Sequence, residues 1–302
     1  MIMDVQKLNE KVLSNGMTRK EYYDSLNRDF TQDPRVYHGA FVKLTDIAYD
    51  TASDRQKYDV YMPMNPGKYP TIIWVHGGGW FMGDRSDFAM GYLIPFIAHG
   101  YTVVSIGYRL ADSAVFPDPV HDVSKALRQI VQRADEYRID PARICLMSGS
   151  AGTTITALAA LWNADIVRAA ILRCSILNFS DMRMQFEKLG LQRERFDYPD
   201  EDTSIEALFL GGSTLELPEA AQRCNPAGYL GPDCPYFLMI HGLEDVDTPY
   251  LQSVEFTEAV RRKSGDPTRA ELVLLPETGH DNGRYDDPET YELELDFLRR
   301  VL

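Results

Sequence analysis

The sequence predicts an α/β fold: a single domain over residues 1–302, with an eight-stranded, mostly parallel sheet flanked by helices and a cap insertion. Two observations lead to this prediction. Short apolar runs suited to buried strands alternate with stretches of helical periodicity, as in units whose right-handed crossovers make neighbouring strands parallel. The chain, with 302 residues of which 44% are apolar and 25% charged, is also long enough to bury one large core.

The eight predicted strands are short and apolar, and the first two show rough alternation with a period of two. They lie at 41–49, 57–62, 71–75, 101–108, 142–147, 167–174, 236–241 and 270–275. Helical patterns separate or follow most of the later strands. These are predicted at 87–100, 119–137, 153–162, 249–263 and 288–302.

One stretch of about sixty residues breaks this alternation, and it is too long for a plain connection between strand and helix. We predict that residues 176–230 form a cap or lid over an active site, with a surface insertion as the alternative. Its aromatic residues, among them Phe186, Phe196 and Tyr198, suit either sugar stacking or the interior of the cap. Residues 1–35 suggest helices that pack against the cap.

Charge and cysteine content exclude several classes of function. A net charge of −14 argues against a nucleic-acid partner or an anionic membrane surface. No secretory signal is visible and no apolar run approaches the ~18 residues of a membrane helix, so we expect a cytoplasmic protein. No cysteines have metal-type spacing, and we expect neither metal nor cofactor. Cys145 and Cys174 are predicted to be buried thiols, whereas Cys224 and Cys234 could pair.

A candidate nucleophile, Ser150, lies between a predicted strand and an alanine-rich helix. A strand-to-helix turn of this kind can hold a serine hydroxyl exposed, as in the G-x-S-x-G elbow. Here the flanking small residues are Ser148 and Gly152, so one of the two usual glycines is replaced by serine.

The segment HGGGW directly follows the strand predicted at 71–75. Consecutive glycines leave main-chain N–H groups unobstructed, as a developing oxyanion requires. We therefore predict an oxyanion hole built from the amides of Gly78, Gly79 and Ala151. His76 is expected to brace this loop. Trp80 is predicted to line the substrate pocket, with a place in the core as the alternative.

A catalytic serine needs a histidine base and a carboxylate that orients it, and these follow the serine along an α/β chain of this kind. Of six histidines, His280 lies in the loop after the last predicted strand, which makes it the candidate base. Asp245, deep in the loop after 236–241, is the preferred acid and Asp247 the alternative. Glu244 is expected to face solvent.

These residues together resemble a known family. The motifs that carry the resemblance are HGGGW, YRL, FPDPVHDV, SGSAG, HGLEDVDTP and GH. From about residue 56 to the end, apart from 176–230, the chain is similar to the hormone-sensitive-lipase-like and acetyl-xylan or feruloyl esterase-like branches of the α/β-hydrolase fold. The resemblance implies a Ser150–Asp245–His280 triad and cofactor-free hydrolysis of carboxylic esters. The lipase-like branch usually has G-D-S-A-G at the elbow, where this chain has SGSAG.

Three functions follow from this reading. The first is a serine carboxylesterase that acts through an acyl-enzyme on small or short-acyl esters, including acetylated or feruloylated carbohydrate. The second is an amidase, because HGGGW also resembles the loop of kynurenine formamidases. The third is a non-catalytic binding protein on a hydrolase fold. The expected partner is a small-molecule ester, and a homo-oligomer is compatible with the sequence.

Overall fold

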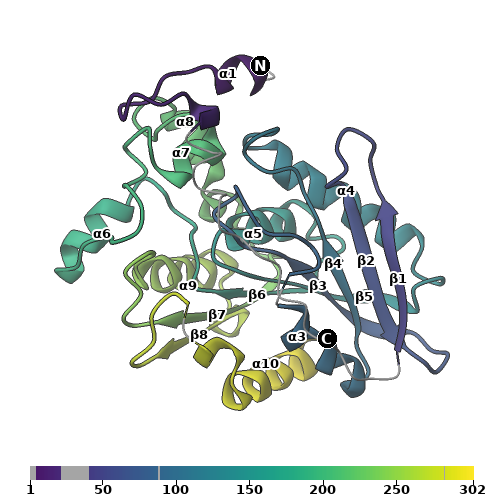
Figure 1. The fold of residues 1–302 in the computed structure, drawn as a ribbon. Helices are drawn as coiled ribbons and strands as arrows, with labels where there is room; N and C mark the ends of the chain where they lie inside the picture. Colours follow the sequence, from purple (N-terminus) through teal and green to yellow (C-terminus); the bar gives the residue numbers. More distant parts are fainter. Residues whose placement is uncertain (1–4, 22–40, 88, 282) are drawn as a thin grey trace.

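The computed structural model describes residues 5–21, 41–87, 89–281 and 283–302, and it confirms the predicted eight-stranded sheet (Figure 1). The strand order is β1-β2-β4-β3-β5-β6-β7-β8. Strand β2 pairs antiparallel with both β1 and β4, and all other pairs are parallel. The strands are β1 (Phe41–Ala48), β2 (Lys57–Pro63), β3 (Tyr69–Val75), β4 (Thr102–Ile106), β5 (Ile139–Gly149), β6 (Ala169–Arg173), β7 (Tyr236–Gly242) and β8 (Ala270–Leu275).

Burial along the strands follows their position in the sheet. Every residue of the central strands β4 and β6 is buried, as expected where helices cover both faces of a parallel sheet. The edge strand β1 has no fully buried residue. Because β3, β5, β6, β7 and β8 are parallel, their carboxyl ends reach the same edge of the sheet, and ligand sites in such sheets form outside that edge.

Helices cover the two faces of the sheet in separate groups (Figure 1). Two hydrophobic clusters result, one that contains side chains of α4, α5 and α9 and one that contains those of α3, η1 and α10. These helices are α3 (Met90–Leu93), η1 (Ile94–His99), α4 (Asp118–Gln132), α5 (Gly152–Trp162), α9 (Leu251–Ser264) and α10 (Pro288–Val301).

The helix predicted at 87–100 is shorter and less regular than its pattern suggested. One α-helical turn, α3, passes directly into the 3-10 turn η1 around Pro95, which has no N–H group to continue α-helical hydrogen bonding. The helix ends at Gly100 as predicted, with φ of 81°. The helix predicted at 119–137 likewise ends early, at Gln132.

Residues 174–235, which join β6 to β7, are here called the connecting segment. They contain three short α-helices and one 3-10 turn, which lie beyond the helical layers in Figure 1. Ser204 begins α7 by accepting a hydrogen bond from Ala207 N, and Gly211, with φ of 91°, ends it. The elements are α6 (Met182–Leu189), α7 (Ile205–Leu210), α8 (Pro218–Cys224) and η2 (Pro226–Tyr229).

The described N-terminal residues, 5–21, contact the connecting segment (Figure 1). They include the short helix α1 (Val5–Asn9). Lys11 Nζ lies 2.8 Å from Glu216 Oε2, and Ser14 N donates to Asp202 Oδ2 at 2.9 Å. The rest of the N-terminal segment predicted at 1–35 lies outside the described residues.

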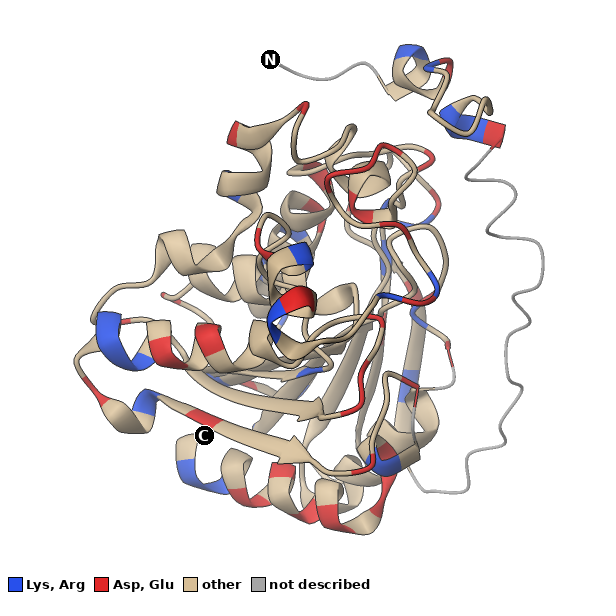
Figure 2. Ribbon diagram, turned by 90° about the vertical axis from the view of Figure 1, so that its left-hand side faces the viewer, with Lys and Arg blue, Asp and Glu red and all other residues tan. Residues whose placement is uncertain are grey.

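The structure decides the state of the cysteines, and Cys145 and Cys174 are buried thiols as predicted. All four cysteines are free and buried, so Cys224 and Cys234 form no disulfide. Figure 2 shows acidic and basic residues together on the outer helices. Among the described helices, none has the combination of length and apolar character needed to cross a bilayer.

Candidate active site

Ser150 lies on the sharp turn between β5 and α5. Its φ of 53° is in the left-handed region, which is uncommon for a residue other than glycine. Gly152 follows two residues later, and a Cβ there would lie 2.6 Å from the main-chain oxygens of Val75 and His76. The second small residue of the elbow is therefore required. Ser148 belongs to β5 and is fully buried, so the strand accommodates a hydroxymethyl group where the usual motif has glycine.

The structure brings Ser150, His280 and Asp245 into one hydrogen-bonded chain. Ser150 Oγ lies 2.8 Å from Nε2 of His280, and Nδ1 of His280 lies 2.8 Å from Oδ2 of Asp245. Because the carboxylate can only accept, Nδ1 carries the proton and Nε2 is left to accept from the serine hydroxyl. This is the arrangement in which a serine hydroxyl can transfer its proton on attack.

The loop after β7 holds Asp245 in place by using both of its carboxylate oxygens. Oδ1 accepts from the main-chain N–H groups of Asp247 and Thr248 at 2.9 and 2.8 Å, and Oδ2 also accepts from Thr248 Oγ1 at 3.0 Å. Asp247, the alternative acid, instead directs Oδ2 to Arg195. Glu244 is exposed, as expected. The geometry thus favours Asp245 over Asp247 as the partner of the histidine.

Burial and charge together determine the ionisation of this pair. Burial of Asp245 opposes its charged form, but His280 and His241 lower the pKa of this carboxyl well below its ordinary value. Burial likewise opposes charging of His280, yet the Asp245 carboxylate raises the pKa of the imidazole. Asp245 is therefore ionised wherever the protein is folded near neutral pH, and it stabilises the imidazolium.

The glycine loop after β3 approaches the serine with its main chain exposed to the cavity. Gly78 and Gly79 have φ of 98° and 57°, and a Cβ on Gly78 would lie 2.4 Å from the main-chain oxygen of Met82. A Cβ on Gly77 would lie 2.8 Å from the oxygen of Gly149. Ala151 is the N-cap of α5, so its amide lies at the end of a helix where N–H groups lack intrahelical acceptors. The glycine loop and the start of α5 therefore lie beside Ser150 at the cavity.

His76 braces the glycine loop from inside the core. Its ring is fully buried and stacks on Tyr108, with the ring centroids 4.3 Å apart. Burial lowers the pKa of His76 to about 4, so the ring is neutral. Tyr108 Oη donates to the main-chain oxygen of His76 at 2.8 Å, which fixes the point where the loop leaves β3.

Trp80, predicted to line the pocket, lies instead in the hydrophobic core. It is 1% exposed and stacks on Phe209, with centroids 4.8 Å apart. Phe209 belongs to the connecting segment, so the side chain of Trp80 lies against that segment. The aromatic residues that do line the cavity include Trp74 and Phe81.

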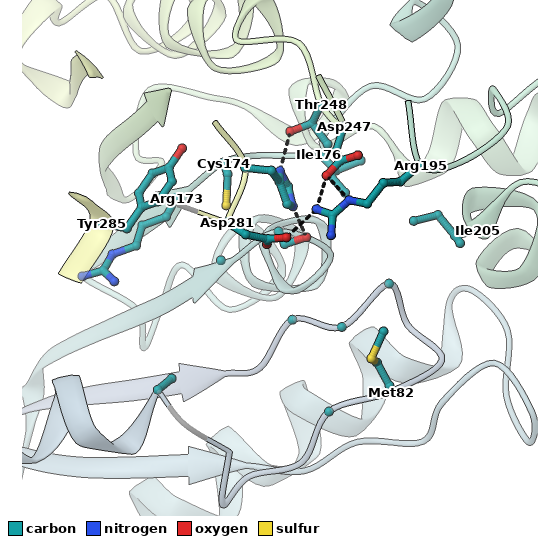
Figure 3. Close-up of a pocket in the computed structure, with 18 of the residues that line it drawn as sticks. Met82, Arg173, Cys174, Ile176, Arg195, Ile205, Asp247, Thr248, Asp281 and Tyr285 are labelled. Atoms are coloured by element: carbon teal, nitrogen blue, oxygen red, sulfur yellow. Dashed lines mark hydrogen bonds and ion pairs between the residues drawn. The ribbon is translucent and has the colours of Figure 1, made fainter. Parts of the chain in front are cut away.

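A cavity of about 480 Å³ opens over Ser150, a size that suits a small molecule (Figure 3). Strand-end loops form one part of its wall, and the connecting segment forms another through Arg193, Arg195, Phe196 and Ile205. Phe196 is one of the aromatic residues singled out from the sequence, whereas Arg193, Arg195 and Ile205, and also Thr248, were not identified from it. The only local signal in the loop of Thr248 concerned Asp245 itself, because an aspartate side chain often accepts from the main-chain N–H two residues on, as it does here from Asp247.

The carboxylates beside His280 also have the composition of a metal site. One ligand atom each from Asp245, Asp247 and His280 lie within 4.8 Å of one another. However, Asp247 is paired with the Arg195 guanidinium, and Nδ1 of His280 is engaged by Asp245. A second cation would have to displace these partners, so the residues do not fit a resident metal.

The fold and the site together define an α/β-hydrolase. A sequence model of the BD-FAE family matches residues 58–260, and the chain belongs to this family. It is similar to the esterases LipC and LipQ of Mycobacterium tuberculosis, with 29% identity over 80% of the chain and 25% over 72%. The chain spans 60% and 53% of these two relatives. In fold it resembles a truncated carbohydrate esterase from gut microbiota, with a TM-score of 0.74, 22% identity, and 86% of this chain and 96% of that one covered.

Proposed function

We propose that this protein is a serine-dependent carboxylic ester hydrolase that acts on small or short-acyl esters through an acyl-enzyme. The observation that carries the proposal is the continuous chain of 2.8 Å contacts from Ser150 through His280 to Asp245 at the wall of a 480 Å³ cavity. The esterase names of LipC and LipQ support the same activity.

Each residue has a role in the proposed reaction. As Ser150 Oγ attacks the ester carbonyl carbon, its proton passes to Nε2 of His280, and Asp245 stabilises the resulting imidazolium. The amides of Gly78, Gly79 and Ala151 bind the tetrahedral oxyanion. Losing one such donor costs on the order of 3 kcal/mol of transition-state stabilisation.

Collapse of this intermediate breaks the bond to the alcohol oxygen, which takes the proton back from the imidazolium and leaves the acyl group on Oγ. A water molecule then repeats the attack with His280 as base, and Ser150 is regenerated. Both half-reactions thus begin with an unprotonated Nε2 of His280, which accepts a proton first from Ser150 and then from water. The resting site has His280 in this state.

We also propose that residues 176–230 form a cap over this site, within a single hydrolase domain, and that the N-terminal segment supports it. Arg193, Arg195, Phe196 and Ile205 in the cavity wall, and the Lys11–Glu216 ion pair, support this assignment. Acetylated or feruloylated carbohydrate is the proposed substrate class, because the aromatic side chains of the cavity can stack on a sugar or feruloyl ring and a structurally similar protein is named a carbohydrate esterase.

The test compares the wild-type protein with Ser150→Ala on p-nitrophenyl acetate. We expect wild-type turnover and loss of nearly all of it in the variant, with an unchanged melting temperature. A fluorophosphonate probe should label the wild-type protein at Ser150 and leave Ser150→Ala unlabelled. Turnover of p-nitrophenyl acetate by Ser150→Ala at the wild-type rate would contradict the proposal.

An ester panel then defines the substrate. It should include short and long acyl groups, acetylated sugars, feruloyl esters and N-formylkynurenine. Hydrolysis of N-formylkynurenine in preference to every ester would make the protein an amidase that uses the same triad. Failure of both labelling and turnover would favour a binding protein on a hydrolase fold.

A further inference from the structure

Three consecutive residues of the connecting segment, 193–195, contact the loop that carries Asp245. Glu194 N donates to the main-chain oxygen of Val246 at 3.3 Å, and Arg193 Nε donates to that of Asp247 at 2.9 Å. Arg195 Nε donates to Oδ2 of Asp247 at 2.6 Å. The connecting segment is therefore bonded to the acid loop through both main chain and side chains.

Arg193 anchors this contact in the interior of the protein. Its guanidinium and the carboxylate of Glu206 are both completely buried and form two hydrogen bonds, of 2.9 and 2.8 Å. A third bond, of 2.7 Å, runs to the oxygen of Asp197. Buried charges remain in a folded protein when they are paired and fully bonded in this way, so the position of residue 193 is fixed.

Arg195 differs from Arg193 because it reaches both loops of the proposed triad. Its Nη2 bonds to Oδ2 of Asp247 and lies 2.6 Å from Oδ2 of Asp281, the residue that follows His280 (Figure 3). Asp247 is 3% exposed, and among the described residues its Oδ1 has no hydrogen-bond partner. Because one oxygen of this buried carboxylate has no hydrogen bond, Asp247 depends on the Arg195 guanidinium to compensate its charge.

The charges around His280 come from several elements. Asp245 and Asp247 lie on the loop after β7, Asp281 on the loop after β8, and Arg195 on the connecting segment. His241, at the end of β7, shares Oδ2 of Asp245 at 3.3 Å.

Other titratable groups that line the cavity include Cys174, directly after β6, and Tyr285, after β8; burial raises the pKa of both, so they are neutral. Arg173, at the end of β6, also lines the cavity and pairs with Glu294 and Asp286. Both Asp247 and Asp281 act to raise the pKa of His280. The guanidinium that pairs with these two carboxylates must act in the opposite direction.

We propose that Arg195 is a positioning residue for the triad: it ties the acid loop and the histidine loop to one cation supplied by the connecting segment, and thereby sets the geometry and the charge around His280. This inference rests on the proposed function, because it concerns the same base. It gives the connecting segment a part in the reaction besides shaping the cavity.

The test compares Arg195→Gln and Arg195→Lys with the matched control Arg183→Gln. Arg183 is also a half-exposed arginine of the connecting segment, but it pairs with Asp200 and Glu201. In Arg195→Gln the carboxylates of Asp247 and Asp281 lose their cation, so the pKa of His280 should rise. The acid limb of the pH profile of kcat/KM should therefore shift to higher pH by about 0.5 unit. Arg195→Lys keeps the charge and should stay near the wild-type profile. Arg183→Gln should leave both the profile and kcat unchanged.

Asp281→Asn provides a second variant that removes no buried group, because this carboxylate is 68% exposed. It should move the acid limb in the opposite direction, to lower pH. The inference is overturned if Arg195→Gln has the profile of Arg183→Gln, or if Asp281→Asn moves the limb upward.

NMR titration of the His280 imidazole separates this inference from the proposed function, because it needs no turnover. The imidazole pKa should rise in Arg195→Gln relative to the wild-type protein and fall in Asp281→Asn. If the wild-type protein proved inactive while these shifts appeared, the proposed function would fail and the electrostatic coupling would stand. If the wild-type protein were active and the pKa of the His280 imidazole did not change in either variant, the inference about Arg195 would be wrong and the proposed function would stand.

Discussion

The strand-end loops and the connecting segment line the same cavity, but they are built differently. The strand-end loops depend on main-chain geometry: Gly78 and Ser150 have φ of 98° and 53°, and added atoms at Gly78 would meet main-chain oxygen. The connecting segment reaches the site with long side chains, such as Arg195 and Phe196. In the strand-end loops the important groups are held by the backbone, so a substitution there disturbs the loop itself. In the connecting segment they are side chains, and each can be substituted separately.

The largest expected effect separates two aspartates of one strand-end loop. Asp245→Asn should lower kcat about 10⁴-fold, because an amide in place of the carboxylate favours the wrong tautomer of His280. Asp247→Asn, which keeps Asp245 in contact with the imidazole, should lower kcat less than tenfold. Steady-state kinetics on p-nitrophenyl acetate measures both. Equal losses in the two variants would contradict the assignment of the triad acid.

A pair of glycine substitutions tests the main-chain contribution directly. Gly78→Ala should lower kcat about 10²- to 10³-fold, because the new methyl group meets Met82 and displaces the proposed oxyanion donors. Gly190→Ala, in the connecting segment, is the matched control. Gly190 has a similarly positive φ of 67°, but an added Cβ there would meet no heavy atom within 4 Å. The substitution should cost about 1 kcal/mol of stability and leave kcat unchanged.

Thermal unfolding measures the loss of stability expected for Gly190→Ala, and steady-state kinetics on p-nitrophenyl acetate measures its kcat. A tenfold loss of kcat in Gly190→Ala would show that the connecting segment is as sensitive to main-chain changes as the glycine loop. The contrast between the two regions would then be lost.

A smaller effect is expected for an aromatic side chain of the connecting segment. Phe196 lies at the cavity wall in an edge-to-face contact with Phe81, with centroids 6.5 Å apart. Phe196→Ala should raise KM about two- to tenfold for feruloyl or other aryl esters, with little change in kcat, because it removes binding that is equal in the ground and transition states. Acetyl esters of small alcohols are the control, and their KM should not change.

The smallest effect concerns pH in the wild-type protein. His280 must be neutral to accept the serine proton, and Asp245 raises its pKa. The acid limb of kcat/KM should therefore have its midpoint above the ordinary histidine value of about 6.5, and activity should rise with pH through it. A pH series from 5 to 9 measures this. A midpoint below about 6 would mean that burial outweighs the Asp245 carboxylate.

Much of the fold and several site residues could be predicted because they depend on local patterns. The apolar runs predicted all eight strands, and the elbow sequence and HGGGW predicted the turns that the structure places side by side. Pro95 explains why the pattern at 87–100 was a poorer guide, since periodicity in apolar residues does not reveal where the main chain changes from α to 3-10 geometry.

Trp80 and Arg195 show where sequence patterns stop being informative. A tryptophan next to a glycine loop suits either a pocket or a core, and only its tertiary contact with Phe209 shows that it lies in the core. Arg195 lies fifty-two residues before Asp247 along the chain, and no spacing rule connects them. The choice of Asp245 over Asp247 had a sequence argument, but the hydrogen bonds of Thr248 provide its physical reason.

The sequence by itself determined the mostly parallel sheet, the order along the chain of the proposed nucleophile, acid and base, and the glycines of the loop after β3. These are properties of periodicity and of residue type at a turn. Only the tertiary structure decided which aspartate meets His280, where Trp80 lies, and that Arg195 bridges the two loops beside the base. Such contacts join residues far apart in the chain, and they depend on how the connecting segment folds back over the carboxyl ends of the strands.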